Sequence, residues 1–120
     1  MGQLLFIDDD SDALEMYTKA VSLADHQAYV AVDAKQAWKV IENYPLDLIF
    51  VDINLPGVSG LQLLREFSQN EKTRSVPVII LSAVPEGEVD RELLNDSELF
   101  LSKPVSLHRL LTVIKKYETG

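Results

Sequence analysis

The sequence predicts an α/β fold in which a five-stranded parallel sheet lies between two layers of helices, forming a doubly wound, three-layer sandwich. Short apolar runs alternate with segments of helical period five times along the 120 residues, and such strand–helix units build parallel sheets. Most of the runs are apolar at every position, as in strands buried on both faces. No repeat, low-complexity stretch or linker interrupts the pattern, so we interpret residues 1–120 as one domain.

The predicted strands are short runs of β-branched and other apolar residues. Four of them are Leu4–Ile7, Leu48–Val51, Val78–Leu81 and the shorter Leu99–Leu101. The remaining run, Ala28–Val32, is more mixed, because Tyr29 and Ala31 alternate with Val30. This mixed pattern favours an edge strand.

Four helices are predicted from apolar residues at helical spacing. The first buries Ala13, Met16, Tyr17, Ala20, Val21 and Ala24, the second Ala37, Val40, Ile41 and Tyr44, the third Leu61, Leu64 and Phe67, and the last Leu107, Leu110, Leu111 and Ile114. Asp33 with Gln36 resembles a capping box before the second helix, and Ser59 can cap the third. The segment Glu86–Asn95 follows Pro85 and has few apolar anchors, which predicts a short or irregular additional helix.

Polar side chains follow the predicted strands at the points where the strands end. They are Asp8, Asp9 and Asp10 after the first strand, Asp52 after the third, Ser82 after the fourth, and Ser102, Lys103 and Pro104 after the fifth. The carboxyl ends of parallel strands lie at one edge of a sheet, where ligands bind. We therefore expect carboxylates, a hydroxyl and an ammonium to converge there, with Asp10 capping the first helix.

Clustered carboxylates at this edge predict a divalent cation. Carboxylates that lie close together repel one another, so without a cation some must be protonated or turn into water. Mg²⁺ prefers oxygen ligands and usually takes one or two carboxylates together with waters and substrate phosphate. With a lysine and a hydroxyl, such a site suits phosphoryl transfer. An aspartate carboxylate can itself accept the phosphoryl group as an acyl phosphate.

Each of these residues also has an ordinary structural interpretation when taken alone. Asp8 and Asp9 can cap a helix, Asp52 can turn the following loop, Ser82 can be a loop hydroxyl and Lys103 a solvated charge. Their joint placement at strand ends, in the order acidic, acidic, hydroxyl, lysine, favours a functional site.

Four motifs of the chain match those of a known family. They are Asp8–Asp9 after the first strand, the loop Asp52–Gly60 in the form Asp-x-x-(Met/Leu)-Pro-x-x-x-Gly, Ser82–Ala83, and Lys103–Pro104. With these motifs, the chain from Gln3 to about Tyr117 resembles a two-component receiver domain, the phosphoacceptor module of bacterial response regulators. The resemblance implies a flavodoxin-like sheet with strand order 2-1-3-4-5.

The resemblance implies a magnesium site and a phosphoacceptor. By this resemblance, Asp52 would accept the phosphoryl group. Asp9, Asp52 and the backbone carbonyl of Asn54 would bind Mg²⁺ directly, and Asp8 would act mainly through a metal-bound water. Lys103 would pair with one phosphoryl oxygen.

The resemblance also implies a switch. Ser82 hydrogen bonds to another phosphoryl oxygen, and Phe100 matches the aromatic residue that turns inward when the hydroxyl moves. The resemblance further implies that the Lys103–Pro104 peptide bond is cis, as is usual in the family. The segment Leu94–Glu98 departs from the family, because it lacks the Gly-Ala pair that often precedes the fifth strand.

By this resemblance the chain is a signalling module and not a classical enzyme. A histidine kinase or a histidine phosphotransfer protein donates the phosphoryl group, and the module assists its own phosphorylation and dephosphorylation. The surface around the additional helix predicted at Glu86–Asn95 (the fourth helix of the family), the fifth strand and the last helix then controls a partner or an output domain. The pathway, the output and the oligomeric state stay open.

Three other functions compete with this interpretation. An aspartate-nucleophile phosphatase commonly carries a second aspartate two residues after the nucleophile, where this chain has Asn54. A flavin-binding electron carrier of similar topology requires a Ser/Thr-rich phosphate loop, where this chain has Asp8–Asp10. A degenerate receiver that acts only by protein binding is disfavoured by the complete set of Asp8, Asp9, Asp52, Ser82 and Lys103.

Composition excludes several other classes. The net charge of −8, from 11 Lys and Arg against 19 Asp and Glu, disfavours direct nucleic-acid binding. The absence of cysteine excludes disulfides and thiolate metal sites. The chain shows neither an apolar run long enough for a membrane span nor a secretory leader, so we expect a cytoplasmic protein without membrane contact.

Overall fold

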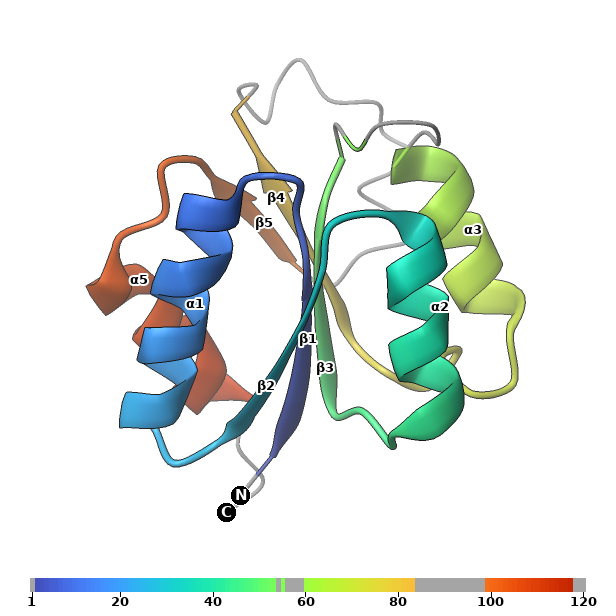
Figure 1. Ribbon diagram of the computed structural model, residues 1–120, viewed down its shortest axis with the longest axis horizontal. Coiled ribbons are helices and arrows are strands. Elements are labelled where there is room, and N and C mark those ends of the chain that lie inside the picture. Colours follow the sequence, from blue (N-terminus) through green and yellow to red (C-terminus); the bar gives the residue numbers. More distant parts are fainter. Residues whose placement is uncertain (1, 54, 56–59, 84–98, 118–120) are drawn as a thin grey trace.

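The computed structural model describes residues 2–53, 55, 60–83 and 99–117. Five parallel strands form one sheet in the order β2-β1-β3-β4-β5. The strands are β1 (Gln3–Ile7), β2 (Gln27–Ala31), β3 (Leu48–Asp52), β4 (Val78–Ser82) and β5 (Leu99–Ser102). Helices α1 (Ser11–Leu23) and α5 (Leu107–Lys116) cover one face of the sheet, and α2 (Ala34–Asn43) and α3 (Gly60–Gln69) cover the other (Figure 1). The predicted three-layer fold and strand order are confirmed.

Alternation along the strands divides the apolar side chains between two cores. In β1, Leu4 and Phe6 pack with the α1 and α5 side chains, whereas Leu5 and Ile7 pack with those of α2 and α3. Every residue of β3 and β4 is buried. Because both faces of these strands are covered, their carboxyl ends are held in place by packing on two sides.

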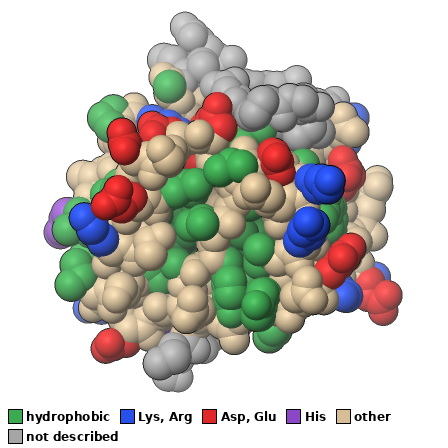
Figure 2. Space-filling view, in the orientation of Figure 1, with side chains coloured by type: hydrophobic (Ala, Val, Ile, Leu, Met, Phe, Trp, Pro, Cys, Tyr) green, Lys and Arg blue, Asp and Glu red, His purple; other side chains and the backbone are tan. Residues whose placement is uncertain are grey.

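Strand β2 forms one edge of the sheet, as its mixed sequence predicts, but it begins and ends one residue earlier than expected. Hydrophobic side chains lie along the middle of the face that β2 crosses (Figure 2). Val30 of β2 is 44% exposed, and Val32, which directly follows the strand, is 37% exposed. The alternation read from the sequence therefore reflects a strand with an uncovered side.

Two of the three predicted helix caps lie in the described residues, and both are present. Asp10 precedes α1 and accepts hydrogen bonds from the backbone N–H groups of Asp12 at 3.0 Å and Ala13 at 3.3 Å. Asp33 precedes α2 and accepts from Gln36 N at 2.8 Å. The Gln36 side chain reaches back to Val32 N instead of Asp33 N, so the capping box is closed one residue earlier than in the usual motif.

The prediction that Tyr44 and Leu107 are buried in the core is wrong. Tyr44 is 46% exposed and stacks on Tyr29 with ring centroids 4.4 Å apart, because its extended backbone has already left the helical path of α2. Leu107 is 42% exposed, because it lies in the first turn of α5, where a helix has neighbours in one axial direction only. Buried residues that the predicted stripes omitted are Leu14, Leu63 and Val113.

Some predictions lie outside the described residues. They concern the Ser59 cap and the segment Glu86–Asn95. No helix in the described part of the chain is long and apolar enough to cross a membrane.

Candidate phosphoacceptor and metal site

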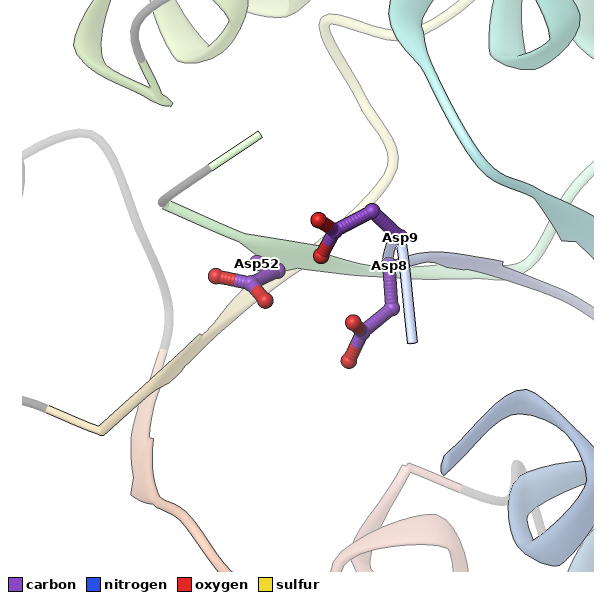
Figure 3. Close-up of side chains that lie close together, drawn as sticks. All are labelled: Asp8, Asp9 and Asp52. Atoms are coloured by element: carbon purple, nitrogen blue, oxygen red, sulfur yellow. The ribbon is translucent and has the colours of Figure 1, made fainter. Parts of the chain in front are cut away.

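Three aspartates meet where β1 and β3 end (Figure 3). Asp8 and Asp9 lie in the short link between β1 and α1, and Asp52 is the last residue of β3. The Asp8 backbone N–H donates to Ala31 O at 3.0 Å, which continues the sheet one residue beyond β1. One carboxylate oxygen of each aspartate lies within 4.8 Å of the other two. The predicted convergence of these carboxylates is observed.

The three aspartates differ in their access to solvent. Asp8 is fully buried, Asp52 is 5% exposed, and Asp9 is exposed. Asp9 is therefore accessible to a ligand arriving from solvent, Asp52 keeps a small exposed area, and Asp8 is enclosed by the protein.

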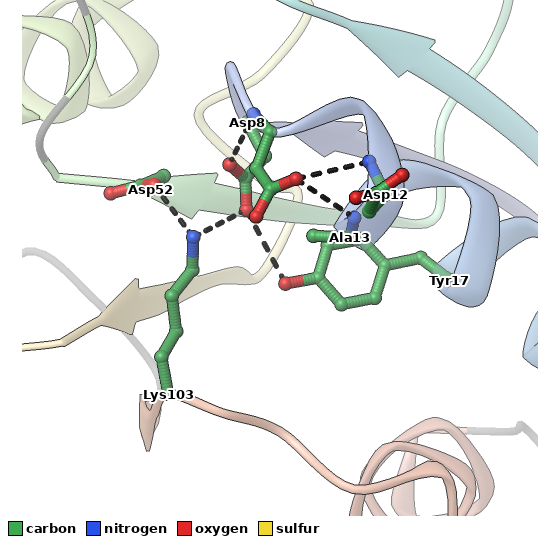
Figure 4. A network of polar contacts seen from close by, with 7 residues as sticks. Asp8, Asp12, Ala13, Tyr17, Asp52 and Lys103 are labelled. Atoms are coloured by element: carbon green, nitrogen blue, oxygen red, sulfur yellow. Dashed lines mark hydrogen bonds and ion pairs between the residues drawn. The ribbon is translucent and has the colours of Figure 1, made fainter.

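Lys103 bridges two of the carboxylates. Its Nζ lies 2.6 Å from Asp8 Oδ2 and 2.8 Å from Asp52 Oδ2 (Figure 4). Its backbone N–H donates to Ser82 O at 2.7 Å, which ties the end of β5 to the end of β4. The Lys103–Pro104 peptide bond is cis, as predicted. Burial by itself lowers the pKa of Lys103, but hydrogen bonds to Asp52 and Asp8 outweigh burial and raise the pKa above its usual range.

Tyr17 also reaches this site, from the buried side of α1, although its spacing predicts only a core residue. Its hydroxyl donates to Asp8 Oδ2 at 3.3 Å. Asp8 Oδ1 accepts from the backbone N–H of Asp10 at 3.0 Å. Burial raises the pKa of Asp8, while the hydrogen bonds from Lys103 and Asp10 oppose that change. Burial, followed by the charge of Asp8, raises the pKa of Tyr17, so its hydroxyl stays protonated and able to donate.

The hydroxyl and the aromatic residue predicted for the switch lie on neighbouring strands. Ser82 ends β4, is fully buried, and pairs with Ser102 of β5. Phe100 pairs with Ile80 and is partly buried against the core shared with α2 and α3. Asn54, whose carbonyl is a predicted metal ligand, lies outside the described residues.

The donor set fits Mg²⁺. It consists of carboxylate oxygens, which hard divalent cations prefer, and a single ammonium offsets only part of the charge of three carboxylates. Asp9 is exposed to solvent, so water ligands can reach an ion at this site and complete its coordination shell.

Comparisons with known proteins agree with this geometry. The response regulator receiver domain family matches residues 4–115. The chain belongs to this family. The receiver domain is 32% identical over 115 residues to the phosphate regulon transcriptional regulatory protein PhoB of Pseudomonas aeruginosa. The matched region covers 93% of this chain and 49% of PhoB. It is 26% identical to the polar-differentiation response regulator DivK of Brucella ovis, covering 95% of this chain and 94% of DivK.

Solved structures show the same fold. The receiver domain superposes on the chemotaxis response regulator CheY4 of Vibrio cholerae with a TM-score of 0.90 at 20% identity, covering 98% of this chain and 99% of CheY4. It matches a CheY-like receiver domain from Methanospirillum hungatei with a TM-score of 0.87 at 25% identity, covering 97% and 92% of the two chains. The receiver family consists of phosphoacceptor signalling modules and not of classical enzymes, so the phosphatase and flavin-carrier alternatives are disfavoured.

The chain spans only part of some relatives. It covers about half of PhoB, at 49%, and 11% of the sensor histidine kinase TmoS of Ectopseudomonas mendocina, to which it is 29% identical. Receiver domains thus occur in this group as parts of longer regulators and kinases.

Proposed function

We propose that this receiver domain accepts a phosphoryl group on Asp52 in a Mg²⁺-dependent reaction and so relays a signal. The observation that carries the proposal is the position of the Asp52 carboxylate. It lies at the carboxyl end of β3, 2.8 Å from Lys103 Nζ and beside the exposed Asp9. A nucleophile, a cation and a second carboxylate with solvent access are thereby brought to one place.

The chemical step needs little beyond positioning and charge. A carboxylate oxygen of Asp52 forms a bond to phosphorus, and the bond from phosphorus to the donor atom breaks, with its electron pair leaving on the donor. The donor is a phosphohistidine nitrogen in a kinase or phosphotransfer protein, or the acetate oxygen of acetyl phosphate. Lys103 offers its ammonium to the developing negative charge, and Ser82 offers a hydroxyl.

Asp9 and Asp52 would hold Mg²⁺ directly, together with the carbonyl of Asn54, and Asp8 would contact it through a water. The bound ion supplies electrostatic stabilisation of the phosphoryl oxygens. Asp8 is the residue suited to the indirect contact, because it is fully buried and already hydrogen bonded to Lys103, Tyr17 and the Asp10 backbone.

The signal would leave the site through β4 and β5. Phosphoryl charge on Asp52 draws the Ser82 hydroxyl and the Lys103 ammonium towards it, and Phe100 moves into the space behind Ser82. A partner or output domain would read β5 and α5 together with the segment Pro85–Asn95, which lies outside the described residues. We further propose that the cognate donor is a histidine kinase or histidine phosphotransfer protein, that residues 1–120 act as one receiver module, and that the module works in the cytoplasm.

Intact-mass spectrometry after incubation with acetyl phosphate and Mg²⁺ tests the proposal. We expect the addition of one phosphoryl group, its loss with hydroxylamine because the product is an acyl phosphate, and no addition when EDTA removes the metal. A mass that does not change, or an adduct that resists hydroxylamine, contradicts phosphorylation of an aspartate.

Asp9→Ala is expected to abolish the stabilisation of the fold by Mg²⁺. A ligand that binds only the folded state at ten times its Kd raises the free energy of unfolding by about 1.4 kcal/mol, so millimolar Mg²⁺ should raise the wild-type Tm. Without metal, Asp9→Ala should melt at or above the wild-type temperature, since one of three repelling carboxylates is gone. Differential scanning calorimetry measures both effects. Asp12→Ala, at another exposed position, is the control and keeps the Mg²⁺ response; an equal response in Asp9→Ala rules out Asp9 as a ligand.

Phe100→Ala is expected to separate phosphorylation from the switch. Its Asp52 should still be modified, but the change in hydrogen–deuterium exchange of β5 and α5 on adding beryllofluoride should disappear. Val76→Ala, which also trims a partly buried side chain of the same core, is the control for general loosening and should keep the response. A response that persists in Phe100→Ala would make Phe100 an ordinary core residue.

A further inference from the structure

Asp8 Oδ2 is shared by two side-chain donors that come from different parts of the fold. Lys103 Nζ approaches it at 2.6 Å from the end of β5, and the Tyr17 hydroxyl approaches it at 3.3 Å from α1 (Figure 4). Tyr17 is 2% exposed, and its ring stacks on that of Phe6 with centroids 5.0 Å apart. The position of the hydroxyl is therefore set by core packing and not by the site itself.

The two donors compete for the same oxygen. An O–H···O hydrogen bond is usually 2.5–3.0 Å long, so the Tyr17 contact at 3.3 Å is stretched while Lys103 occupies Oδ2 at 2.6 Å. Each donor withdraws negative charge from the oxygen and weakens the attraction of the other. If Lys103 moves away, the Asp8 carboxylate can turn towards the fixed Tyr17 hydroxyl, and the shorter hydrogen bond partly satisfies a carboxylate that is fully buried.

We infer that Tyr17 is a positioning residue whose hydrogen bond to Asp8 weakens the Lys103–Asp8 ion pair. Because Lys103 then leaves Asp8 more easily, Tyr17 favours metal binding and phosphorylation. This inference rests on the proposed function. The Lys103 ammonium lies against two of the three carboxylates that would serve Mg²⁺, so the ammonium and the metal ion compete for the same negative charge. A tighter Lys103–Asp8 ion pair opposes both the arrival of the metal and the transfer of Lys103 to a phosphoryl oxygen.

Tyr17→Phe tests the inference, because it removes the hydroxyl and keeps the stacked ring. We expect the Kd for Mg²⁺, from NMR titration of the backbone amides, to rise about threefold to tenfold, the modest range reflecting the stretched hydrogen bond. Without metal, the Lys103 ammonium protons should exchange more slowly with water, since Asp8 holds them more tightly. Phosphorylation by acetyl phosphate should slow at limiting Mg²⁺ and recover at saturating Mg²⁺.

Tyr29→Phe is the matched control. Tyr29 also donates its hydroxyl to a side chain, Gln3 Oε1 at 2.9 Å, and also stacks on an aromatic ring, that of Tyr44. Its hydrogen bond joins β1 and β2 away from the three aspartates. We expect its Kd for Mg²⁺ and its Lys103 exchange to equal those of the wild type.

Two backgrounds show whether Tyr17 acts through the ion pair. In Asp8→Asn and in Lys103→Met, Tyr17→Phe should no longer change the Kd for Mg²⁺. An equal rise in the Kd in these backgrounds overturns the inference, as does an unchanged Kd with unchanged Lys103 exchange in Tyr17→Phe alone. If Lys103→Met does not fold, the Asp8→Asn background and the ammonium exchange decide. Absence of Mg²⁺ binding in the wild type contradicts the proposed function instead, so the two failures are distinguishable.

Discussion

Asp52→Asn is expected to reduce phosphoryl incorporation from acetyl phosphate to zero. The amide is close in shape to the carboxylate, so the end of β3 should keep its place, but the amide oxygen is too weak a nucleophile to form the acyl phosphate. Intact-mass spectrometry over a time course measures the effect. At the same time, the variant should still fold, because Asn can accept a hydrogen bond from Lys103 as Asp52 does.

Asp33→Asn is the matched control for this substitution. Asp33 caps α2 through its side chain, and asparagine is an equally good cap, so this variant should be phosphorylated at the wild-type rate. Incorporation in Asp52→Asn at the wild-type level contradicts the assignment of Asp52. Partial incorporation, mapped by peptide mass spectrometry to Asp8 or Asp9, contradicts it as well.

Lys103→Met is expected to have the largest effect on stability. It leaves Asp8, which is fully buried, and Asp52, which is 5% exposed, without the ammonium that lies within 2.8 Å of both. Removing one partner of a buried ion pair typically costs about 3–5 kcal/mol, because the remaining charge is left uncompensated. Urea denaturation measures the loss in the free energy of unfolding. Mg²⁺ should return part of it, since a cation can replace some of the missing positive charge.

A second substitution separates the charge effect from lost packing. Asp8→Asn in the Lys103→Met background removes the buried charge and should recover much of the lost stability. Lys19→Met is the exposed control. Lys19 lies 3.5 Å from Glu15 with 71% of its side chain exposed, so it should change the free energy of unfolding by less than about 0.5 kcal/mol. A Lys103→Met variant as stable as Lys19→Met, or one that Asp8→Asn does not rescue, contradicts this account of the ion pair.

Local patterns in the sequence account for the elements and for most of their buried faces. Apolar runs such as Ile49–Val51 predict strands because both faces of a parallel strand are covered. The caps at Asp10 and Asp33 are predicted because their hydrogen bonds join residues two or three positions apart. The periodic pattern is wrong for Tyr44 and Leu107, because both lie at helix ends, where the pattern continues although the helix or the side chains that cover it do not.

The convergence of the aspartates also follows from the sequence, because all strands of a parallel sheet end at the same edge. Only the tertiary structure decides which carboxylates are buried and what neutralises them. Asp8 is fully buried because several elements pack around it. Lys103 contacts both Asp8 and Asp52, and it lies 95 positions from Asp8 in the sequence. The sequence places Tyr17 in a core stripe, but it does not show that the far end of its ring reaches a carboxylate. That contact depends on how α1 packs against β1, and packing geometry is set by all the neighbouring side chains together and not by spacing along one helix.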